Sequence, residues 1–191
     1  MSGSQSSVID PLKGLRAMAA GDRVRSSARQ QFCGEIDIRI GRDGTWFYHG
    51  SPIGRKPLVK VFASVLRREG DDYWLVTPAE RGKIKVDEVP FTAVEVNAVG
   101  SGPSQALTFR TNLDDEVVAD AQHPIRVAHA ADGQEPRPYI LVRDRLEARI
   151  LRPVFYELVE LAQMQSIGGE EVYGVWSREQ FFPLGRPDPG A

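Results

Sequence analysis

The first clear pattern along the chain is a strict alternation of apolar and charged residues. Between residues 35 and 40, three isoleucines alternate with Asp37 and Arg39, which is the period of a strand with one buried and one solvated face. Glycines and an aspartate follow in residues 41–44, and strand-forming aromatics follow in residues 45–49. The pattern therefore predicts a β-hairpin.

Similar short segments recur along the rest of the chain, each bounded by turn residues. They are rich in the β-branched and aromatic residues that fit a pleated surface. We predict a second hairpin from Leu107 to Asp120 that turns at residues 112–115. We also predict strands at residues 73–77, 83–86, 91–99, 139–142, 145–150, 172–177 and 180–184. Short turns between consecutive strands predict antiparallel sheets.

Two segments have helical spacing instead. Each opens with a proline, Pro57 or Pro153, which suits the first helical position, and the predicted helices cover residues 57–68 and 153–164. Apolar positions three or four residues apart define the face that each helix should bury. These positions are Leu58, Val59, Val61, Phe62, Val65 and Leu66 in the first helix, and Val154, Phe155, Leu158, Val159 and Ala162 in the second.

The strand pattern occurs twice, about seventy residues apart, which is the signature of an internal repeat. The earlier copy contains Ile36–Arg39, Asp43, Pro52-Ile53, Tyr73-x-Leu75-Val76 and Ile84; the later copy contains Leu107–Arg110, Asp114, Pro124-Ile125, Tyr139-x-Leu141-Val142 and Ile150. We therefore predict an α+β fold made of two similar antiparallel β-rich halves with a few packed helices. Because the helix lies at different places in the two halves, the repeat is imperfect.

This repeat divides the chain into four parts. Residues 1–31 form a basic N-terminal arm with a short helix, residues 32–100 form the first β-rich unit, and residues 105–184 form the second. Residues 185–191 form a loose tail. The Gly- and Ser-rich stretch between the two units is a natural junction.

Composition excludes several classes of protein. The 191 residues carry 24 basic and 26 acidic side chains, a net charge of -2, which gives no electrostatic drive toward nucleic acid or an anionic membrane. The single cysteine, Cys33, cannot form an internal disulfide. No apolar run approaches the roughly twenty residues of a membrane span, and the first residues do not resemble a signal peptide. We expect a cytoplasmic protein.

The search for chemistry yields few candidates. The three histidines, His49, His123 and His129, lie too far apart to form a metal cluster with Cys33. No nucleophile elbow is present. We therefore expect no metal, no cofactor and no catalytic residue. An enzyme would require His49 or His123 to meet a carboxylate in a cleft.

Large aromatic side chains near positive charge are the better candidates for a binding site. Rings beside guanidinium groups suit planar or anionic ligands, and two similar halves offer a groove at their junction. The residues that we assign to ligand binding on this basis are Trp46, Tyr48, Arg55, Trp74, Thr77, Tyr139 and Arg143. Two of these residues differ between the aligned copies of the repeat. Trp46 is aligned with Val117, and Trp74 is aligned with Ile140.

Several of these segments resemble one bacterial family, domain of unknown function 1285, over residues 32–184. The motifs that carry the resemblance are Phe32-Cys33-Gly34-Glu35-Ile36-Asp37-Ile38-Arg39-Ile40, Asp43-Gly44-Thr45-Trp46-Phe47-Tyr48, Gly50-Ser51-Pro52-Ile53-Gly54-Arg55, Tyr73-Trp74-Leu75-Val76-Thr77-Pro78, Phe109-Arg110-Thr111-Asn112, Arg152-Pro153, Tyr156-Glu157-Leu158-Val159 and Gly174-Val175-Trp176-Ser177. The resemblance implies an α+β fold with two similar halves and a role in ligand sensing or signalling.

Three functions follow from these observations. The leading hypothesis is a non-catalytic domain that binds a small molecule between its halves and reports this to a partner. The second is a protein-interaction module that uses the basic arm or the apolar C-terminal segment around Trp176 and Phe181. The third, an uncharacterised enzyme, has the weakest support. Neither nucleic acid nor a membrane is an expected partner.

Overall fold

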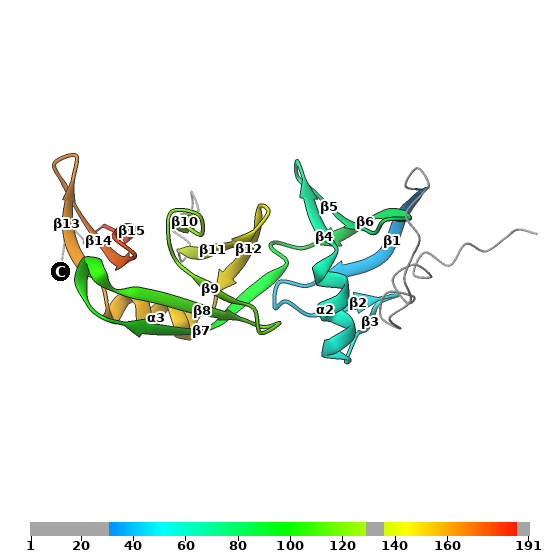
Figure 1. Cartoon of the computed structure of the whole chain (residues 1–191), viewed down its shortest axis with the longest axis horizontal. Coiled ribbons are helices and arrows are strands. Elements are labelled where there is room, and N and C mark those ends of the chain that lie inside the picture. The colour runs from blue at the N-terminus through cyan, green and yellow to red at the C-terminus, as the bar shows by residue number, and fades with distance from the viewer. Residues whose placement is uncertain (1–30, 129–135, 187–191) are drawn as a thin grey trace, which may run out of the picture. The chain divides into compact units, whose positions relative to one another are not determined.

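The computed structural model describes residues 31–128 and 136–186 (Figure 1). The predicted N-terminal arm with its helix, and most of the C-terminal tail, lie outside these residues. The chain divides into two compact units. The first contains the described residues up to Arg39 together with Trp46–Val86, and the second contains Ile40–Thr45 and the residues from Asp87 onward.

The first unit is built on a six-stranded sheet, sheet A. Its strands lie in the order β3-β2-β1-β6-β5-β4, and helix α2 (Lys56–Ser64) connects β3 to β4. The strands are β1 (Gln31–Ile40), β2 (Trp46–Tyr48), β3 (Ser51–Pro52), β4 (Leu66–Glu69), β5 (Asp72–Val76) and β6 (Glu80–Val86). Helix α2 buries Val59, Phe62 and Ala63, so the predicted apolar stripe does supply its buried face.

The second unit holds a second six-stranded sheet, sheet B, in the order β10-β11-β12-β7-β8-β9. Its strands are β7 (Phe91–Val99), β8 (Ala106–Thr111), β9 (Glu116–Val118), β10 (Ile125–Ala128), β11 (Arg137–Arg143) and β12 (Leu146–Ile150). A short 3-10 turn, η1 (Gly102–Ser104), joins β7 to β8. Strands β7 and β12 run parallel. Sheet B is therefore mixed, whereas we had predicted only antiparallel pairs.

Helix α3 (Arg152–Glu160) and a small antiparallel sheet, sheet C, complete the second unit. Sheet C consists of β13 (Gln163–Ile167), β14 (Glu170–Ser177) and β15 (Gln180–Gly185). It is tied to sheet B by Ser177, which is fully buried. The Ser177 hydroxyl donates to the Ala119 carbonyl at 2.6 Å and accepts the Leu107 N–H at 2.9 Å. The predicted C-terminal hairpin is confirmed as β14 and β15.

Sheets A and B share one topology, which confirms the two similar halves. Read from β4 to β3, sheet A runs β4-β5-β6-β1-β2-β3, and sheet B runs β10-β11-β12-β7-β8-β9. Each strand from β1 to β6 thus has its counterpart six strands later. The helices do not follow the repeat, because α2 precedes β4 whereas α3 follows β12.

Only part of the aligned pattern falls in counterpart strands. Tyr73–Val76 and Ile84 lie in β5 and β6, and the residues aligned with them lie in the counterparts β11 and β12. Ile36–Arg39 lies in β1, but Leu107–Arg110 lies in β8, which is the counterpart of β2. In the Tyr-x-Leu-Val motif, Leu75 is 1 % exposed while Leu141 is half-buried. A slip of one residue exchanges the two faces of a strand. The repeat therefore lies in the topology, and the comparison of Trp46 with Val117 was wrong.

Both helices end earlier than predicted. Helix α2 stops at Ser64 because Leu66 already pairs with Leu75 in sheet A, and α3 stops at Glu160, before β13. Residues 66–68 are therefore strand, and the end of the second predicted helix is strand β13. On α3, Val154 and Leu158 are buried as predicted. Val159 was also expected inside, but it is 50 % exposed.

Candidate functional site

A cavity of about 630 Å³ in the second unit is lined by three arginines and two aromatic rings. Arg137 comes from β11, Arg149 from β12 and Arg152 from the start of α3, while Phe155 and Tyr156 come from the first turns of that helix. The other lining residues are Pro136, Pro138 and Ile150. No acidic side chain is among the described residues that line the cavity. The wall is therefore cationic on one part and apolar on the other.

The N-terminus of α3 adds to this positive character. Its N-cap residue is Leu151, which has no side-chain oxygen to accept a helix N–H, and no acidic residue occupies the first turn. The unpaired N–H groups at the start of a helix carry a partial positive charge that favours anions. Arg152 stands at this end, and its Nε donates to the Tyr156 hydroxyl at 2.7 Å. This bond holds a guanidinium and a phenol together at the cavity wall.

A carboxylate behind the cavity, Glu88, orients Arg149. Its side chain is largely buried and lies 3.3 Å from Arg149 Nη1, and its other oxygen accepts a 2.5 Å hydrogen bond from the Tyr139 hydroxyl. Burial and the Glu88 carboxylate raise the pKa of Tyr139 to about 12. Tyr139 therefore stays protonated and serves as a fixed donor to Glu88.

The seven residues predicted to bind a ligand do not converge on this cavity. Trp46 is 1 % exposed and packs its ring 6.2 Å from that of Phe62, so it is a core residue of the first unit. The Tyr48 ring lies against that of His49, with the centroids 4.1 Å apart and the ring planes tilted by 53°. Arg55 is exposed at the N-cap of α2.

Trp74 and Thr77 have local structural partners. The Arg81 guanidinium lies 4.2 Å from the centre of the Trp74 ring, which is a cation–π contact on the surface of sheet A. The Thr77 hydroxyl donates to the Glu80 carbonyl and accepts the Glu80 N–H, both at 3.0 Å. Thr77 thus closes the turn between β5 and β6.

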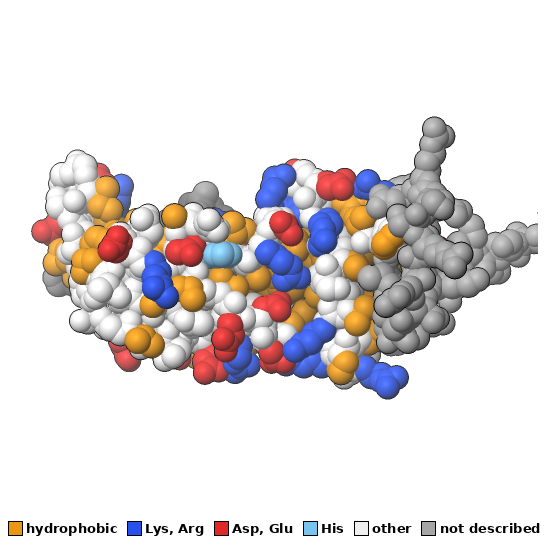
Figure 2. Space-filling model, in the orientation of Figure 1, with side chains coloured by type: hydrophobic (Ala, Val, Ile, Leu, Met, Phe, Trp, Pro, Cys, Tyr) orange, Lys and Arg blue, Asp and Glu red, His pale blue; other side chains and the backbone are white. Residues whose placement is uncertain are grey.

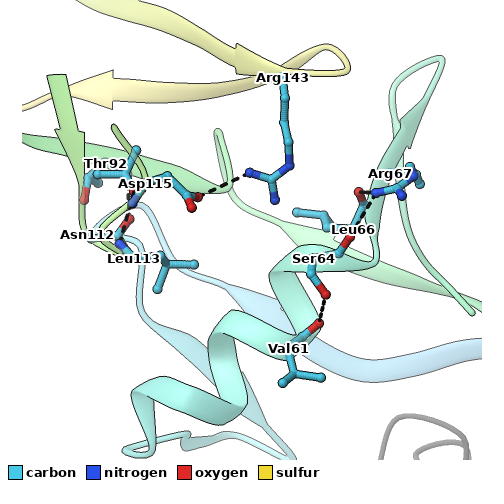
Figure 3. Close-up of polar contacts among 10 residues, drawn as sticks. Val61, Ser64, Leu66, Arg67, Thr92, Asn112, Leu113, Asp115 and Arg143 are labelled. Carbon is cyan, nitrogen blue, oxygen red and sulfur yellow. Dashed lines mark hydrogen bonds and ion pairs between the residues drawn. The ribbon is translucent and has the colours of Figure 1, made fainter. Parts of the chain in front are cut away.

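The two candidates in the second unit are also held by neighbours. Figure 3 shows Arg143 directed at Asp115, 3.3 Å away, and its guanidinium lies 5.2 Å from the centre of the Phe91 ring. The Tyr139 ring is covered by the Arg126 guanidinium at 4.2 Å. Tyr139 is the one candidate that connects to the cavity, through Glu88 and Arg149.

Sequence reasoning missed the arginines that do converge. Arg149 lies within the predicted strand 145–150, and Arg137 lies just before the predicted strand 139–142, but neither was assigned to ligand binding. The spacing of Arg152 and Tyr156 could have predicted that these two side chains lie together, because residues four apart on a helix share one face. Arg149 lies three residues before Arg152 in the chain, and the β11–β12 hairpin brings Arg137 close to them. The sequence does not show that these side chains line one cavity.

Two histidines of the described residues, His49 and His123, each meet a carboxylate, and Asp37, the partner of His49, lines a cavity of about 440 Å³ beside Lys83. His49 Nδ1 lies 2.9 Å from Asp37 Oδ2, and both side chains are about two-thirds exposed, 66 % and 67 %. His123 Nδ1 lies 3.1 Å from Asp120 Oδ1, in a tight turn. There, burial disfavours ionisation of Asp120, but the backbone N–H groups of His123 and Gln122 outweigh it and lower the pKa of Asp120. Neither histidine lines one of the cavities described, so in neither pair do both members share a cleft.

Other chemistry is equally sparse in the described part of the chain. No three His, Cys, Asp or Glu side chains there are grouped closely enough to hold a metal ion. Neither α2 nor α3 has the length and apolar character needed to cross a membrane. Figure 2 shows acidic and basic side chains mixed over the face in view, rather than the one-signed surface that typically binds nucleic acid.

The protein thus consists of two β-rich units, the second of which contains a cavity lined by three arginines. The chain belongs to the DUF1285 family: residues 28–89 match "Domain of unknown function (DUF1285), N-terminal domain", and residues 90–184 match "Protein of unknown function (DUF1285), C-terminal domain". The family resemblance seen in the sequence is thus confirmed. None of the curated proteins matches the chain.

Two solved structures are similar to the chain. A DUF1285 family protein from Silicibacter pomeroyi DSS-3 is 44 % identical, with a TM-score of 0.78 over 90 % of this chain and 94 % of that one. A DUF1285 family protein from Shewanella baltica OS155 is 23 % identical, with a TM-score of 0.52 over 65 % of this chain and 91 % of that one. The second likeness concerns the fold alone.

Proposed function

We propose that the protein is a non-catalytic domain that binds a small anionic ligand in the arginine cavity of its second unit. The observation that carries the proposal is the convergence of Arg137, Arg149 and Arg152 on one cavity of about 630 Å³. That volume lies within the roughly 300–1,000 Å³ typical of small-molecule sites. The sequence placed the ligand at the junction of the halves; the cavity proposed here lies within the second unit.

The chemistry of the wall defines the ligand class. Guanidinium groups bind carboxylate or phosphate oxygens through paired, charge-assisted hydrogen bonds, and the start of α3 favours negative charge beside them. Phe155 and Tyr156 provide ring surface on the same wall. The best-fitting ligand carries an oxyanion group at one end and an apolar or aromatic group at the other. A sensing role, as the family resemblance implies, would follow if a partner responds to the occupied cavity.

Binding titrations on the full chain test the proposal. Thermal shift against a panel of aromatic and aliphatic carboxylates and phosphates identifies a ligand, and calorimetry gives its Kd. Replacing Arg137 or Arg152 by Gln should weaken binding by about ten- to a hundredfold, because each removes a charge-assisted bond. Affinity should also fall as salt rises.

Arg178→Gln is the matched control, since Arg178 is an exposed arginine of the same unit outside the cavity. It should leave the Kd unchanged. The proposal fails if no member of the panel binds saturably, or if the two cavity variants bind as tightly as the control.

A further inference from the structure

Strand β13 lies at an open edge of sheet C. It pairs with β14 over Gln163–Ile167, and the sheet order β13-β14-β15 places it at the end. The opposite edge strand, β15, contacts β10 of sheet B. In the described chain, β13 therefore presents one row of backbone N–H and C=O groups to its surroundings.

The other sheet edges are protected in ways that β13 is not. Proteins block edge-to-edge pairing with short strands, prolines, charges and covering elements. Strand β3 has two residues, one of them proline, β4 has the sequence LRRE, and β9 has three residues with a glutamate. Strands β10 and β15 lie against each other. Strand β13, with the sequence QMQSI, is five residues long, uncharged and free of proline.

Exposed apolar side chains cluster on and beside this edge. Met164 and Ile167 in β13 are 46 % and 48 % exposed, and Tyr173, which pairs with Met164, is 40 % exposed. Next to them, a groove of about 310 Å³ between α3 and sheet C is lined mainly by apolar groups, including Val159, Tyr173 and Leu184. An open edge beside apolar surface is the arrangement used to add a strand from another chain.

We propose that β13 pairs with β13 of a second copy of this chain, so that two three-stranded sheets join into one of six strands. The antiparallel register centred on Gln165 places Gln163 opposite Ile167 and Met164 opposite Ser166 of the second copy. Each apolar residue then meets an uncharged one. The backbone groups along the open edge gain partners, and Met164 and Ile167, which lie on opposite faces of β13, each gain a cross-strand neighbour from the second copy.

Charge favours a second copy over an unrelated strand. A two-fold antiparallel pairing sets each residue of a segment opposite a residue of the same segment, so a segment with a net charge repels its own copy. Strand β13 contains no charged residue and therefore pairs with itself without repulsion. Strand β4, with Arg67, Arg68 and Glu69, carries a net positive charge that disfavours pairing with its own copy.

Sedimentation velocity of the full chain over a range of concentrations tests the proposal. The wild type should sediment at twice the monomer mass as concentration rises. Met164→Lys and Ile167→Lys should each raise the dimer Kd by about tenfold or more, because an ammonium group is placed in the joined sheet. Both positions are exposed in the single chain, so the variants should keep the wild-type circular dichroism and melting temperature.

Two further variants make the test specific. Val99→Lys changes a more exposed residue, 62 % exposed, outside sheet C, and should leave the dimer Kd unchanged. Adding Ser166→Glu to Met164→Lys places opposite charges across the proposed register and should recover at least half of the lost dimer. A wild type that stays monomeric throughout overturns the proposal. So does dimerisation unaffected by the β13 lysines, or a double variant no better than Met164→Lys.

Discussion

Tyr139 shows how the surroundings of one residue change its chemistry. Burial and the neighbouring Glu88 carboxylate raise its pKa from 10.0 to about 12. The folded state therefore favours the protonated phenol. Its stabilising contribution is complete below the unfolded pKa near 10 and is lost as the pH rises through 12.

We expect a spectrophotometric titration of the folded protein to show one of the five tyrosines ionising at a pKa of about 12. Tyr139→Phe should remove this step, and stability at alkaline pH should then fall less steeply than in the wild type. Tyr173→Phe changes an exposed tyrosine and should leave the step in place. If the step survives in Tyr139→Phe, the late-titrating group is another tyrosine.

At the scale of elements, sheet C depends on a glycine at a close approach of two strands. A Cβ on Gly174 would lie 2.4 Å from the Phe182 carbonyl oxygen and 2.6 Å from the Phe181 ring. Gly174 pairs with Pro183 on β15, so the backbone cannot yield without disturbing the sheet. Gly174→Ala should lower the free energy of unfolding by about 1–3 kcal/mol, as measured by urea denaturation.

Gly185 provides a control in the same sheet. A Cβ there would have no atom within 4 Å, so Gly185→Ala should change the free energy of unfolding by less than about 0.5 kcal/mol. If both variants lower the free energy of unfolding equally, sheet C tolerates the added methyl group equally well at the two positions. The close approach would then not explain the glycine.

Elements with strong internal periodicity could be predicted from the sequence, and those defined by their neighbours could not. The alternation in β1 and the apolar stripes of α2 and α3 are local signals, and all three elements are present. Strand β4 was read as helix because Val65 and Leu66 continue the helical spacing of α2. Strand β13 is mostly polar, and pairing with β14 defines it. Strand pairing depends on neighbouring strands, so the residues of the strand itself often show no clear β pattern.

The same limit applies to the candidate site. Aromatic residues beside arginines drew attention to Trp46 and Trp74, yet Trp46 is buried and Trp74 is partnered by Arg81. Composition near a residue does not tell whether its side chain faces the core or a cavity. The three arginines of the cavity come from β11, β12 and α3, so the β11–β12 hairpin and the passage of the chain from β12 into α3 bring them together.

At the scale of the whole molecule, the duplication is preserved as strand order and not as matching residues. A sheet keeps its topology as long as each strand retains one buried face, so the identities of the side chains can drift. The two halves differ in the position of the helix and in sheet C, which belongs to the second unit. Helix α3 of the second half supplies part of the wall of the arginine-lined cavity. We infer that α3 confines the proposed ligand site to the second half.

The second unit also depends on one side chain that links segments far apart in the chain. The Asn112 amide donates to the Gly44 carbonyl at 3.2 Å, and its oxygen accepts the Thr92 N–H at 3.1 Å; Figure 3 shows its contact with Thr92. Gly44 belongs to the turn 40–45, which clusters with the second unit although β1 and β2 flank it. Removal of the amide leaves two backbone groups without their partner.

We therefore expect Asn112→Ala to lower the free energy of unfolding by about 1–3 kcal/mol and to speed hydrogen exchange at the Thr92 N–H. Asn112→Asp keeps the acceptor for Thr92 but loses the donor to Gly44, so it should protect Thr92 while still destabilising the protein. Asn97→Ala changes an exposed asparagine of β7 and serves as the control. If Asn112→Ala and Asn97→Ala unfold alike, the turn 40–45 is held in the second unit by its backbone bonds alone, chiefly the Asp87 N–H to the Ile40 carbonyl.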